Sequence, residues 1–467
     1  MTGRLSASAI AASVRSGQIR AVDVAEYALA RIDLLNPTLN AFTDITQVRA
    51  IERAEAVDAA IAAGRDPGPL AGVPFAAKNL FDIRGVVTRA GSKINRGNLP
   101  AQADATLVER LEAAGAVLMG ALNMGEYAYD FTGENAHDGP SRNPHDPTRM
   151  SGGSSGGSGT AAASGMVPLT LASDTNGSIR VPSSFCGLFG LKPTYGRLSR
   201  AGTFPFVASL DHLGPIARSA ADLALAYDAM QGPDPADPVC QPPETAPVLP
   251  ELAKGLADLR LAQLGGHFAL GLHPEAEAAV EAVAAALGIE QTIEIEGAGS
   301  ARAAAYLITM AEGAALHLDR LRTRHADFDP DVRDRLIAGA MIPGAWVQRA
   351  QKLRRAFRAE MARVFERFDV LIAPATPCPA PLIGQKTLTL NGKPVPLRPN
   401  LGLYTQPVSF VGLPVVAVPV WPAGSALPVG VQVIAPPWRE DLVLRVAAAL
   451  EEAGVARAPV AAAGPGQ

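Results

Sequence analysis

The sequence has 467 residues with a formal net charge of −4, and 48% of them are hydrophobic and 18% charged. This balance is that of a globular protein, with no basic surface for nucleic acid or an anionic membrane. The three cysteines lack a C-x-x-C pair and the seven histidines lack an H-E-x-x-H motif, so neither a metal nor a redox site is expected. We therefore expect a cytoplasmic protein that uses no cofactor and binds neither nucleic acid nor membrane.

The first part of the chain, residues 1–62, is predicted to be helical. Apolar residues recur at helical spacing from Leu5 to Ile32. The dipeptide Asn36-Pro37 is expected to break this pattern, because proline lacks the N–H group that a helix interior requires.

Helix, glycine and buried strand follow one another in residues 103–119, and the same alternation returns at 167–171 and 259–264. Such an order predicts an α/β layered fold with a largely buried sheet. The lengths of these strands are those of short sheet strands rather than of membrane spans, which need about 20 apolar residues.

The second half of the chain is expected to return to the same sheet. Residues 232–250, rich in proline and aspartate, are predicted to form a loop, and the apolar runs 370–373 and 415–420 are predicted to be strands. Residues 303–368 are arginine-rich with helical periodicity, and we expect them to cap one edge of a site.

The most informative stretch is the glycine–serine run Ser-Gly-Gly-Ser-Ser-Gly-Gly-Ser-Gly at 151–159, which leads into one short apolar element at 160–172. A second turn follows at 173–182, Ser-Asp-Thr-Asn-Gly-Ser-Ile-Arg-Val-Pro. Alone, the run is typical of a flexible linker, and a phosphate-binding loop is a weaker interpretation without a G-K-[ST] ending. Two turns joined by one apolar element favour a site, because glycines let successive N–H groups point into one concavity.

Three residues suit acyl transfer: Ser154 and Ser178, which lie in these two turns, and Lys78, which lies earlier in the chain. Most lysines are surface charges, but Lys78 follows the apolar run Val-Pro-Phe-Ala-Ala, and burial would lower its pKa and let it act as a base. Lys78 would take a proton from Ser154, which would take one from the nucleophile Ser178. Ser178 is equally placed to cap a following helix, and its N–H and those before it could form an oxyanion hole.

Beyond this chemistry, the residues resemble the amidase signature family. The resemblance is carried by the two turns at 152–159 and 173–182, by Cys-Gly-Leu-Phe-Gly-Leu-Lys-Pro-Thr at 186–194, by Ala-Gly-Val-Pro-Phe-Ala-Ala-Lys at 71–78, and by Gly-Leu-Pro-Val-Val-Ala-Val-Pro-Val at 412–420 with Pro-Val-Gly-Val-Gln-Val at 428–433. It implies a cytosolic amidase that forms an acyl-enzyme. It also implies one α/β/α domain over residues 1–467, with a helical region at 1–62, a core at 70–230, a helical cap at 303–368 and a mixed sheet of about eleven strands.

The resemblance also assigns roles to residues. Lys78 is implied to be the base, Ser154 the bridging serine after a cis peptide, and Ser178 the nucleophile. The implied oxyanion donors are the backbone amides of Thr175, Asn176, Gly177 and Ser178.

Two departures from the family pattern concern the substrate. The usual Gly-Gly-Ser is Asn176-Gly177-Ser178, and the common Lys-Asp is Lys78-Asn79. The string Asp-Thr-Asn-Gly-Ser-Ile-Arg resembles the branch of 1-carboxybiuret hydrolases, which act in cyanuric acid degradation. That branch implies a small helical partner similar to the C subunit of the tRNA-dependent amidotransferases, and a dimer or heterotetramer.

The nearest rival is the glutaminase component of the tRNA-dependent amidotransferases, their A subunit. Tyr306 and Arg335 resemble residues of that glutaminase, where the arginine holds the glutamine carboxylate and an aspartate holds its ammonium group. This chain has Leu-Gly-Leu at 401–403, where that aspartate would fall, and a buried ammonium without a counter-charge is costly. We therefore expect a carboxylated ureido substrate, most concretely 1-carboxybiuret, with Gln406 bonded to the ureido group. A general acyl or aryl amidase and an inactive scaffold are the remaining alternatives.

Overall fold

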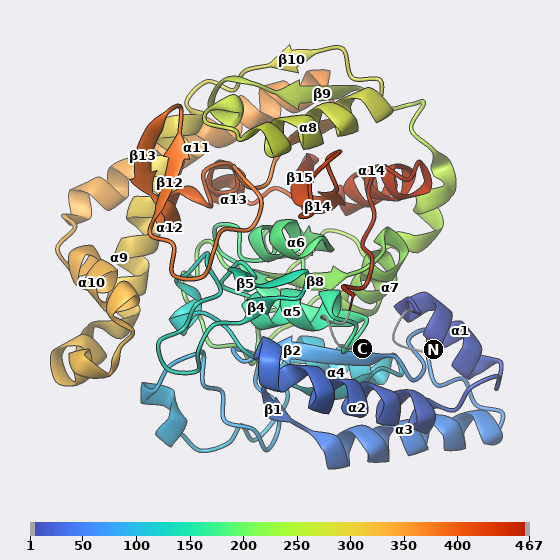
Figure 1. Ribbon diagram of the computed structural model, residues 1–467. Helices are drawn as coiled ribbons and strands as arrows, with labels where there is room; N and C mark the ends of the chain where they lie inside the picture. Colours follow the sequence, from blue (N-terminus) through green and yellow to red (C-terminus); the bar gives the residue numbers. More distant parts are fainter. Residues whose placement is uncertain (1–4, 463–467) are drawn as a thin grey trace.

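The computed structural model describes residues 5–462, which are built around one mixed sheet of eleven strands (Figure 1). Its spatial order is β1-β3-β2-β6-β8-β7-β14-β15-β11-β9-β10. The strands are β1 Phe42–Ile45, β2 Pro74–Lys78, β3 Val117–Leu122, β6 Leu169–Asp174, β7 Phe189–Lys192, β8 His212–Ala217, β9 Leu261–Leu264, β10 Thr292–Ile293, β11 Val370–Pro374, β14 Val415–Val420 and β15 Val429–Ile434.

Two short hairpins lie outside this sheet, β4 Arg142–Asn143 with β5 Asp146–Met150, and β12 Thr387–Leu390 with β13 Lys393–Pro396. The α-helices are α1 Ala7–Arg15, α2 Ala21–Leu39, α3 Gln47–Ala62, α4 Thr106–Ala113, α5 Gly156–Ala163, α6 Arg180–Cys186, α7 Ala220–Met230, α8 Pro274–Ala286, α9 Ala298–Arg324, α10 Pro330–Ala340, α11 Gly344–Arg367, α12 Leu397–Asn400, α13 Gln406–Val411 and α14 Glu440–Glu452.

The sheet is parallel near both ends and antiparallel in its middle. Strands β3, β2 and β6 run parallel, whereas the pairs from β6–β8 to β15–β11 are antiparallel. Helices flank the sheet, with α6 packed on β14 and β15 and α5 on β2 and β6. The middle strands are buried along their whole length, as in β14, because helices cover them and no alternation of polar residues is needed.

The elements predicted from the sequence are present. The strands expected near 167–171, 259–264, 370–373 and 415–420 are β6, β9, β11 and β14, and the last two do return to the same sheet. The region 303–368 forms most of α9, α10 and α11, which lie on the left in Figure 1. None of the helices within residues 5–462 has the length and apolar composition of a membrane span.

Two expectations about local structure were wrong. The apolar element at 160–172 is not single, because its first part ends α5 and its second part enters β6. The helix expected to break at Asn36-Pro37 continues to Leu39. The carbonyl that loses its helical partner to Pro37 is that of Asp33, and both residues are exposed, so water can replace the bond. The helix ends soon after, where Asn40 adopts a left-handed conformation and its N–H donates to the carbonyl of Asn36.

The Asn36 side chain completes this helix end. Its Oδ1 accepts from the N–H groups of Ala41 at 2.8 Å and Phe42 at 2.7 Å, and its Nδ2 donates to the Phe42 carbonyl at 3.2 Å. These bonds direct the chain from α2 into β1. Because β1 pairs with β3, they connect the helical N-terminal region to the sheet.

Replacing Asn36 with alanine should lower the free energy of unfolding by about 1–3 kcal/mol, because two backbone N–H groups lose their acceptor. Chemical denaturation followed by circular dichroism measures the change. Asn98→Ala is the matched control, since Asn98 is exposed and its backbone N–H bond to Asn95 survives the substitution. Equal stability of the two variants would contradict this role.

Candidate active site

Three chain segments meet at the ends of β2 and β6. These strands are parallel neighbours with Ala77 opposite Leu171, so Lys78 and Ser173 reach the same edge of the sheet. The glycine–serine run follows β5, its last four residues form the start of α5, and it is entirely buried. A flexible linker is therefore excluded, and the run is part of the core of the protein.

Lys78 is fully buried and its amino group is surrounded by serines. Its Nζ donates to Ser154 Oγ at 2.7 Å, to Ser173 Oγ at 2.8 Å and to Ser155 Oγ at 3.0 Å. Burial lowers the pKa of Lys78 to about 7, although the negative charges of nearby aspartates, Asp174 first, act in the opposite direction. A substantial fraction of this lysine is therefore neutral near pH 7.

The hydroxyl partners can serve a neutral amine, which donates two hydrogen bonds and accepts one. Ser155 Oγ donates its own proton to the Ser173 carbonyl at 3.2 Å, so it must accept from Lys78. Ser154 and Ser173 thus share the remaining donor and acceptor places on Nζ. The peptide bond before Ser154 is cis, as the family resemblance implied, and proton transfer between Ser154 and Ser178 stays a prediction.

The turn after β6 presents unpaired backbone donors. Within residues 5–462, none of the four N–H groups from Thr175 to Ser178 donates a hydrogen bond to the protein, although the turn is buried. Gly177 has φ of +146°, and a Cβ there would lie 2.4 Å from Thr405 Oγ1, so only glycine fits. Buried, unpaired N–H groups of this kind can hold an anionic oxygen.

Ser178 is not a helix cap. Helix α6 begins at Arg180, and the capping position is Ile179, with no side-chain cap bond. Ser178 lies one residue earlier and lines a cavity, so its hydroxyl is placed for contact with a ligand.

A buried ion pair anchors the turn. Asp174 Oδ1 accepts from Arg180 Nη2 at 2.9 Å, and Asp174 Oδ2 accepts from Arg180 Nε at 3.0 Å and from the N–H of Ile179 at 3.1 Å. Arg180 also donates to the carbonyl of Thr405 at 3.0 Å and to Gln432 Oε1 at 2.6 Å. Both charges are completely buried, and the Arg180 guanidinium keeps the pKa of Asp174 well below its usual range despite that burial.

The cavity beside the turn gathers the predicted binding residues. A hollow that is partly open to solvent is lined by Thr175, Asn176, Ser178, Tyr306, Arg335 and Gln406. Arg335 donates to the main-chain carbonyls of Asp331 at 2.7 Å and of Tyr129, and none of the ion pairs within residues 5–462 includes it. Its guanidinium stacks on the Tyr129 ring, 3.8 Å from the ring centroid, and has no carboxylate of the described residues within ion-pair distance. Such a group in a cavity can bind an anion.

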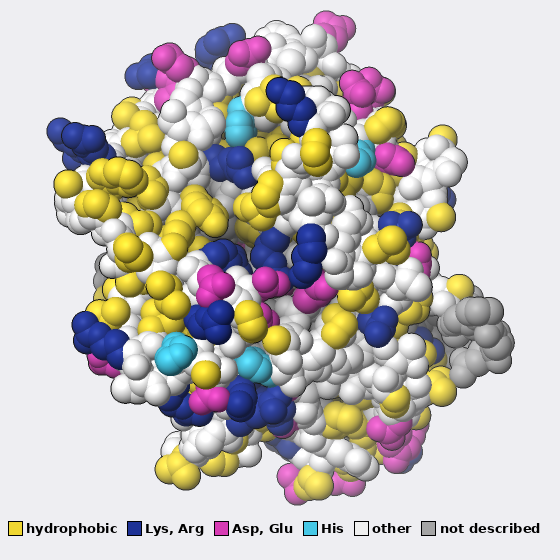
Figure 2. Space-filling model, turned by 60° about the vertical axis from the view of Figure 1, so that its left-hand side comes forward, with side chains coloured by type: hydrophobic (Ala, Val, Ile, Leu, Met, Phe, Trp, Pro, Cys, Tyr) yellow, Lys and Arg dark blue, Asp and Glu magenta, His cyan; other side chains and the backbone are white. Residues whose placement is uncertain are grey.

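A wider space between α10 and residues 385–399 lies beside this cavity and shares Arg335 and Arg398 with it. Asp331 and Lys386 also line it. Asp331 pairs with Arg398 at 3.0 Å and with Lys386 at 3.6 Å. Figure 2, turned toward this side of the molecule, shows acidic and basic side chains close together in a hollow. Arg398 also pairs with Asp130 at 3.2 Å, so its charge is compensated, unlike that of Arg335.

Several residues of the site were not predicted from the sequence. Ser155 and Ser173 contact Lys78, and Tyr129, Thr309 and Arg398 line the cavity. The two serines lie in the two turns at 151–159 and 173–182, so the sequence pattern could have identified them. The other three come from a loop, α9 and α12, and no local pattern marks them.

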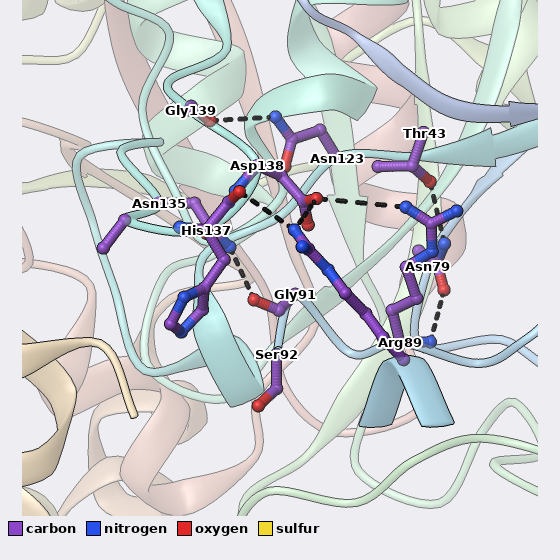
Figure 3. A network of polar contacts seen from close by, with 12 residues as sticks. Thr43, Asn79, Arg89, Gly91, Ser92, Asn123, Asn135, His137, Asp138 and Gly139 are labelled. Carbon is purple, nitrogen blue, oxygen red and sulfur yellow. Dashed lines mark hydrogen bonds and ion pairs between the residues drawn. The ribbon is translucent and has the colours of Figure 1, made fainter. Parts of the chain in front are cut away.

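The departure Lys78-Asn79 has a structural reason (Figure 3). Asn79 Nδ2 donates to Thr43 Oγ1 at 2.8 Å and to Asp44 Oδ2 at 3.2 Å, and its Oδ1 accepts from the N–H of Arg89 at 2.8 Å. An aspartate at this position would lose both donor bonds and face the carboxylate of Asp44. The negative charge that an aspartate at position 79 would bring is present instead on Asp44, which pairs with Arg89 at 2.7 Å.

A serine hydroxyl that lines a cavity, a buried amine and free N–H donors at one sheet edge suit acyl transfer, and the fold and site together point to an amide hydrolase. Comparison with known proteins gives the family. The Amidase family profile matches residues 23–444, and the chain belongs to this amidase family.

Individual relatives and solved structures show which members of the family this chain resembles. The chain is 56% identical over 445 residues to the AtzE subunit of 1-carboxybiuret hydrolase from Pseudomonas sp. (strain ADP), covering 95% of this chain and 97% of that protein. It is 38% identical over 470 residues to the A subunit of the Glutamyl-tRNA(Gln) amidotransferase of Chloroflexus aurantiacus, covering 95% of each. A solved structure, described as a vestigial protein complex that reveals the origins of an s-triazine catabolic enzyme, superposes with a TM-score of 0.96 at 55% identity, over 97% of this chain and all of that one.

Activity should rise with pH through the pKa of Lys78. Below about pH 7 the amine is protonated and has no lone pair for a serine proton, so kcat/KM should fall about tenfold for each pH unit. Above that pH the rate should level off. The measurement is kcat/KM between pH 5.5 and 9.5, with Lys78→Arg as the inactive control because arginine stays charged. A flat profile across this range would exclude Lys78 as the base.

Proposed function

We propose that the enzyme hydrolyses a small carboxylated ureide, most concretely 1-carboxybiuret, and releases ammonia. The observation that carries this proposal is the uncompensated guanidinium of Arg335 in the same cavity as Ser178. It is supported by 56% identity to a protein named as part of a 1-carboxybiuret hydrolase. Arg335 would bind the carboxylate, while Tyr306 and Gln406 would contact the rest of the substrate.

The proposed mechanism uses residues already described. Neutral Lys78 takes the proton of Ser154, Ser154 takes that of Ser178, and Ser178 Oγ bonds to the carbonyl carbon. The N–H groups of residues 175–178 stabilise the resulting oxyanion. Ser154 then returns a proton to the nitrogen as the C–N bond breaks and ammonia leaves. Water, deprotonated by the same route, attacks the acyl-enzyme and frees Ser178.

A glutaminase of the amidotransferase type is less well supported. At position 402, where such an enzyme would place an acid for the ammonium group of glutamine, a Cβ would lie 2.5 Å from the ring of Phe131. An aspartate therefore does not fit unless Phe131 moves. The remaining acid of the cavity, Asp130, is already paired with Arg398 at 3.2 Å.

We also propose that a small helical protein binds this chain as a second subunit, in a dimer or heterotetramer. Support comes from relatives alone. One is named as a component of a hydrolase, another as the A component of an amidotransferase, and a similar solved structure is described as a protein complex. Size-exclusion chromatography with light scattering, with and without a co-expressed small protein similar to the amidotransferase C subunit, tests the assembly.

The test of function is ammonia release from a panel of carboxybiuret generated in situ, allophanate, biuret, glutamine and an aryl amide. Selective turnover of the carboxylated ureide is expected, and Ser178→Ala should abolish it because the acyl-enzyme can no longer form. Turnover of glutamine or the aryl amide instead would overturn the substrate assignment. Full activity of Ser178→Ala would overturn the mechanism.

Arg335→Gln should raise KM for the carboxylated substrate about 10- to 100-fold, the range expected for a lost hydrogen bond to a charged group. Biuret, which has no carboxylate, should show a much smaller change. Arg333→Gln is the matched control on the same helix, because the Nε of Arg333 bonds only to its neighbour Asp334 at 2.8 Å. An equal effect of both variants on both substrates would contradict a carboxylate site at Arg335.

A further inference from the structure

The side chain of Asn176, which stands where the family pattern has glycine, has a fixed orientation. Its Nδ2 donates to Thr309 Oγ1 at 2.8 Å, and Thr309 Oγ1 donates to the Ala305 carbonyl at 2.8 Å. A threonine hydroxyl has a single proton. Because that proton goes to Ala305, Thr309 can only accept from Asn176, and the amide nitrogen of Asn176 must face it.

This leaves the other end of the amide without a partner. Asn176 is 6% exposed, and its Oδ1 is buried with no hydrogen bond within residues 5–462. Buried acceptors are nearly always bonded. Two side-chain groups of this cavity, Asn176 Oδ1 and the Tyr129 hydroxyl, lack a partner within residues 5–462. Of the two, only the amide oxygen cannot donate, so it marks a place where a ligand donor belongs. Asn176 lines the same cavity as Ser178 and Arg335.

Gln406 supplies a hydrogen-bond donor to the same cavity, whereas Asn176 supplies an acceptor. Arg302 Nε donates to Gln406 Oε1 at 3.0 Å, and because arginine has no acceptor, the oxygen of Gln406 must face Arg302. Gln406 therefore offers its NH₂ group to a ligand. The cavity thus combines an acceptor from the turn with a donor from α13.

We propose that Asn176 Oδ1 accepts a hydrogen bond from the substrate N–H adjacent to the scissile carbonyl, and that this bond selects ureides over simple carboxylated amides. The inference rests on the proposed function and deepens it. A ureide has an N–H beside its carbonyl, and an ordinary amide has a CH₂ there, which leaves Asn176 Oδ1 unpaired. Thr309 is the positioning residue that keeps the oxygen of Asn176 turned to the substrate.

Two stable compounds differ in this group alone. N-carbamoylglycine has an N–H where succinamate has a CH₂, and both have a carboxylate and a terminal carboxamide. Their carbonyls differ in intrinsic reactivity, but this difference cancels when the ratio of their kcat/KM values is compared between variants. The wild-type ratio is the reference.

Asn176→Ala should lower the ratio, ureide over amide, at least about tenfold. Thr309→Val should lower it by a smaller factor because the amide of Asn176 is freed to turn, and Thr309→Ser should restore it because the hydroxyl remains. Thermal melts confirm that each variant is folded, and Thr309→Val decides the matter if Asn176→Ala does not fold. An unchanged ratio in folded Asn176→Ala, or in Thr309→Val when only that variant folds, would overturn the proposal.

Binding separates this inference from the proposed function. In the Ser178→Ala background, calorimetry should show that N-carbamoylglycine binds about tenfold or more tightly than succinamate, and that the added change Asn176→Ala removes the difference. Ammonia release without such a preference would overturn the role of Asn176 and leave the function standing. A preference without release from any carboxylated ureide would overturn the function and leave the role of Asn176 standing. Failure to bind either compound would overturn this role.

Discussion

The burial of the Lys78 amino group is the constraint on which the rest of the site depends. Removal from water disfavours the charged form of a lysine, and here it lowers the pKa to about 7. An amine that is partly neutral needs partners that both donate and accept, and a hydroxyl does both from one oxygen atom without adding charge. Serines from the run 151–155 and from β6 therefore surround Nζ, and a carboxylate in their place would raise the pKa again.

The same constraint explains why Asp174 is paired with Arg180. This carboxylate follows Ser173 directly, and its charge is the largest influence that raises the pKa of Lys78. Arg180 bonds to both of its oxygens, so the pair has little net charge. Because Arg180 also reaches Thr405 and Gln432, the pair fastens the 175–178 turn to α13 and β15. One buried ion pair thus supports both the electrostatics of the base and the shape of the turn.

Local patterns predicted what local physics controls. Short apolar runs predicted the strands β6, β9, β11 and β14, and the two Gly/Ser turns with Lys78 predicted the centre of the site. The helix end at Asn36-Pro37 was mispredicted because the bonds that decide it come from a side chain to residues 41 and 42. Thr309 and Arg398 were missed for a related reason. They reach the cavity from α9 and α12 through tertiary packing, which no periodicity records.

The residues proposed to react with the substrate and those proposed to recognise it lie in different parts of this fold. The amine, the serines and the turn lie at strand ends in the buried sheet, where a change in position disturbs the whole core. The groups that would read the substrate stand on α9, α10 and the segment from α12 to α13, which border the opening. Such elements can change without loss of the sheet, so substrate preference can diverge while the buried centre is kept. Asn176 is the exception, because it belongs to the turn itself. Its backbone N–H is one of the four proposed oxyanion donors, and its side-chain oxygen is the acceptor proposed for the substrate.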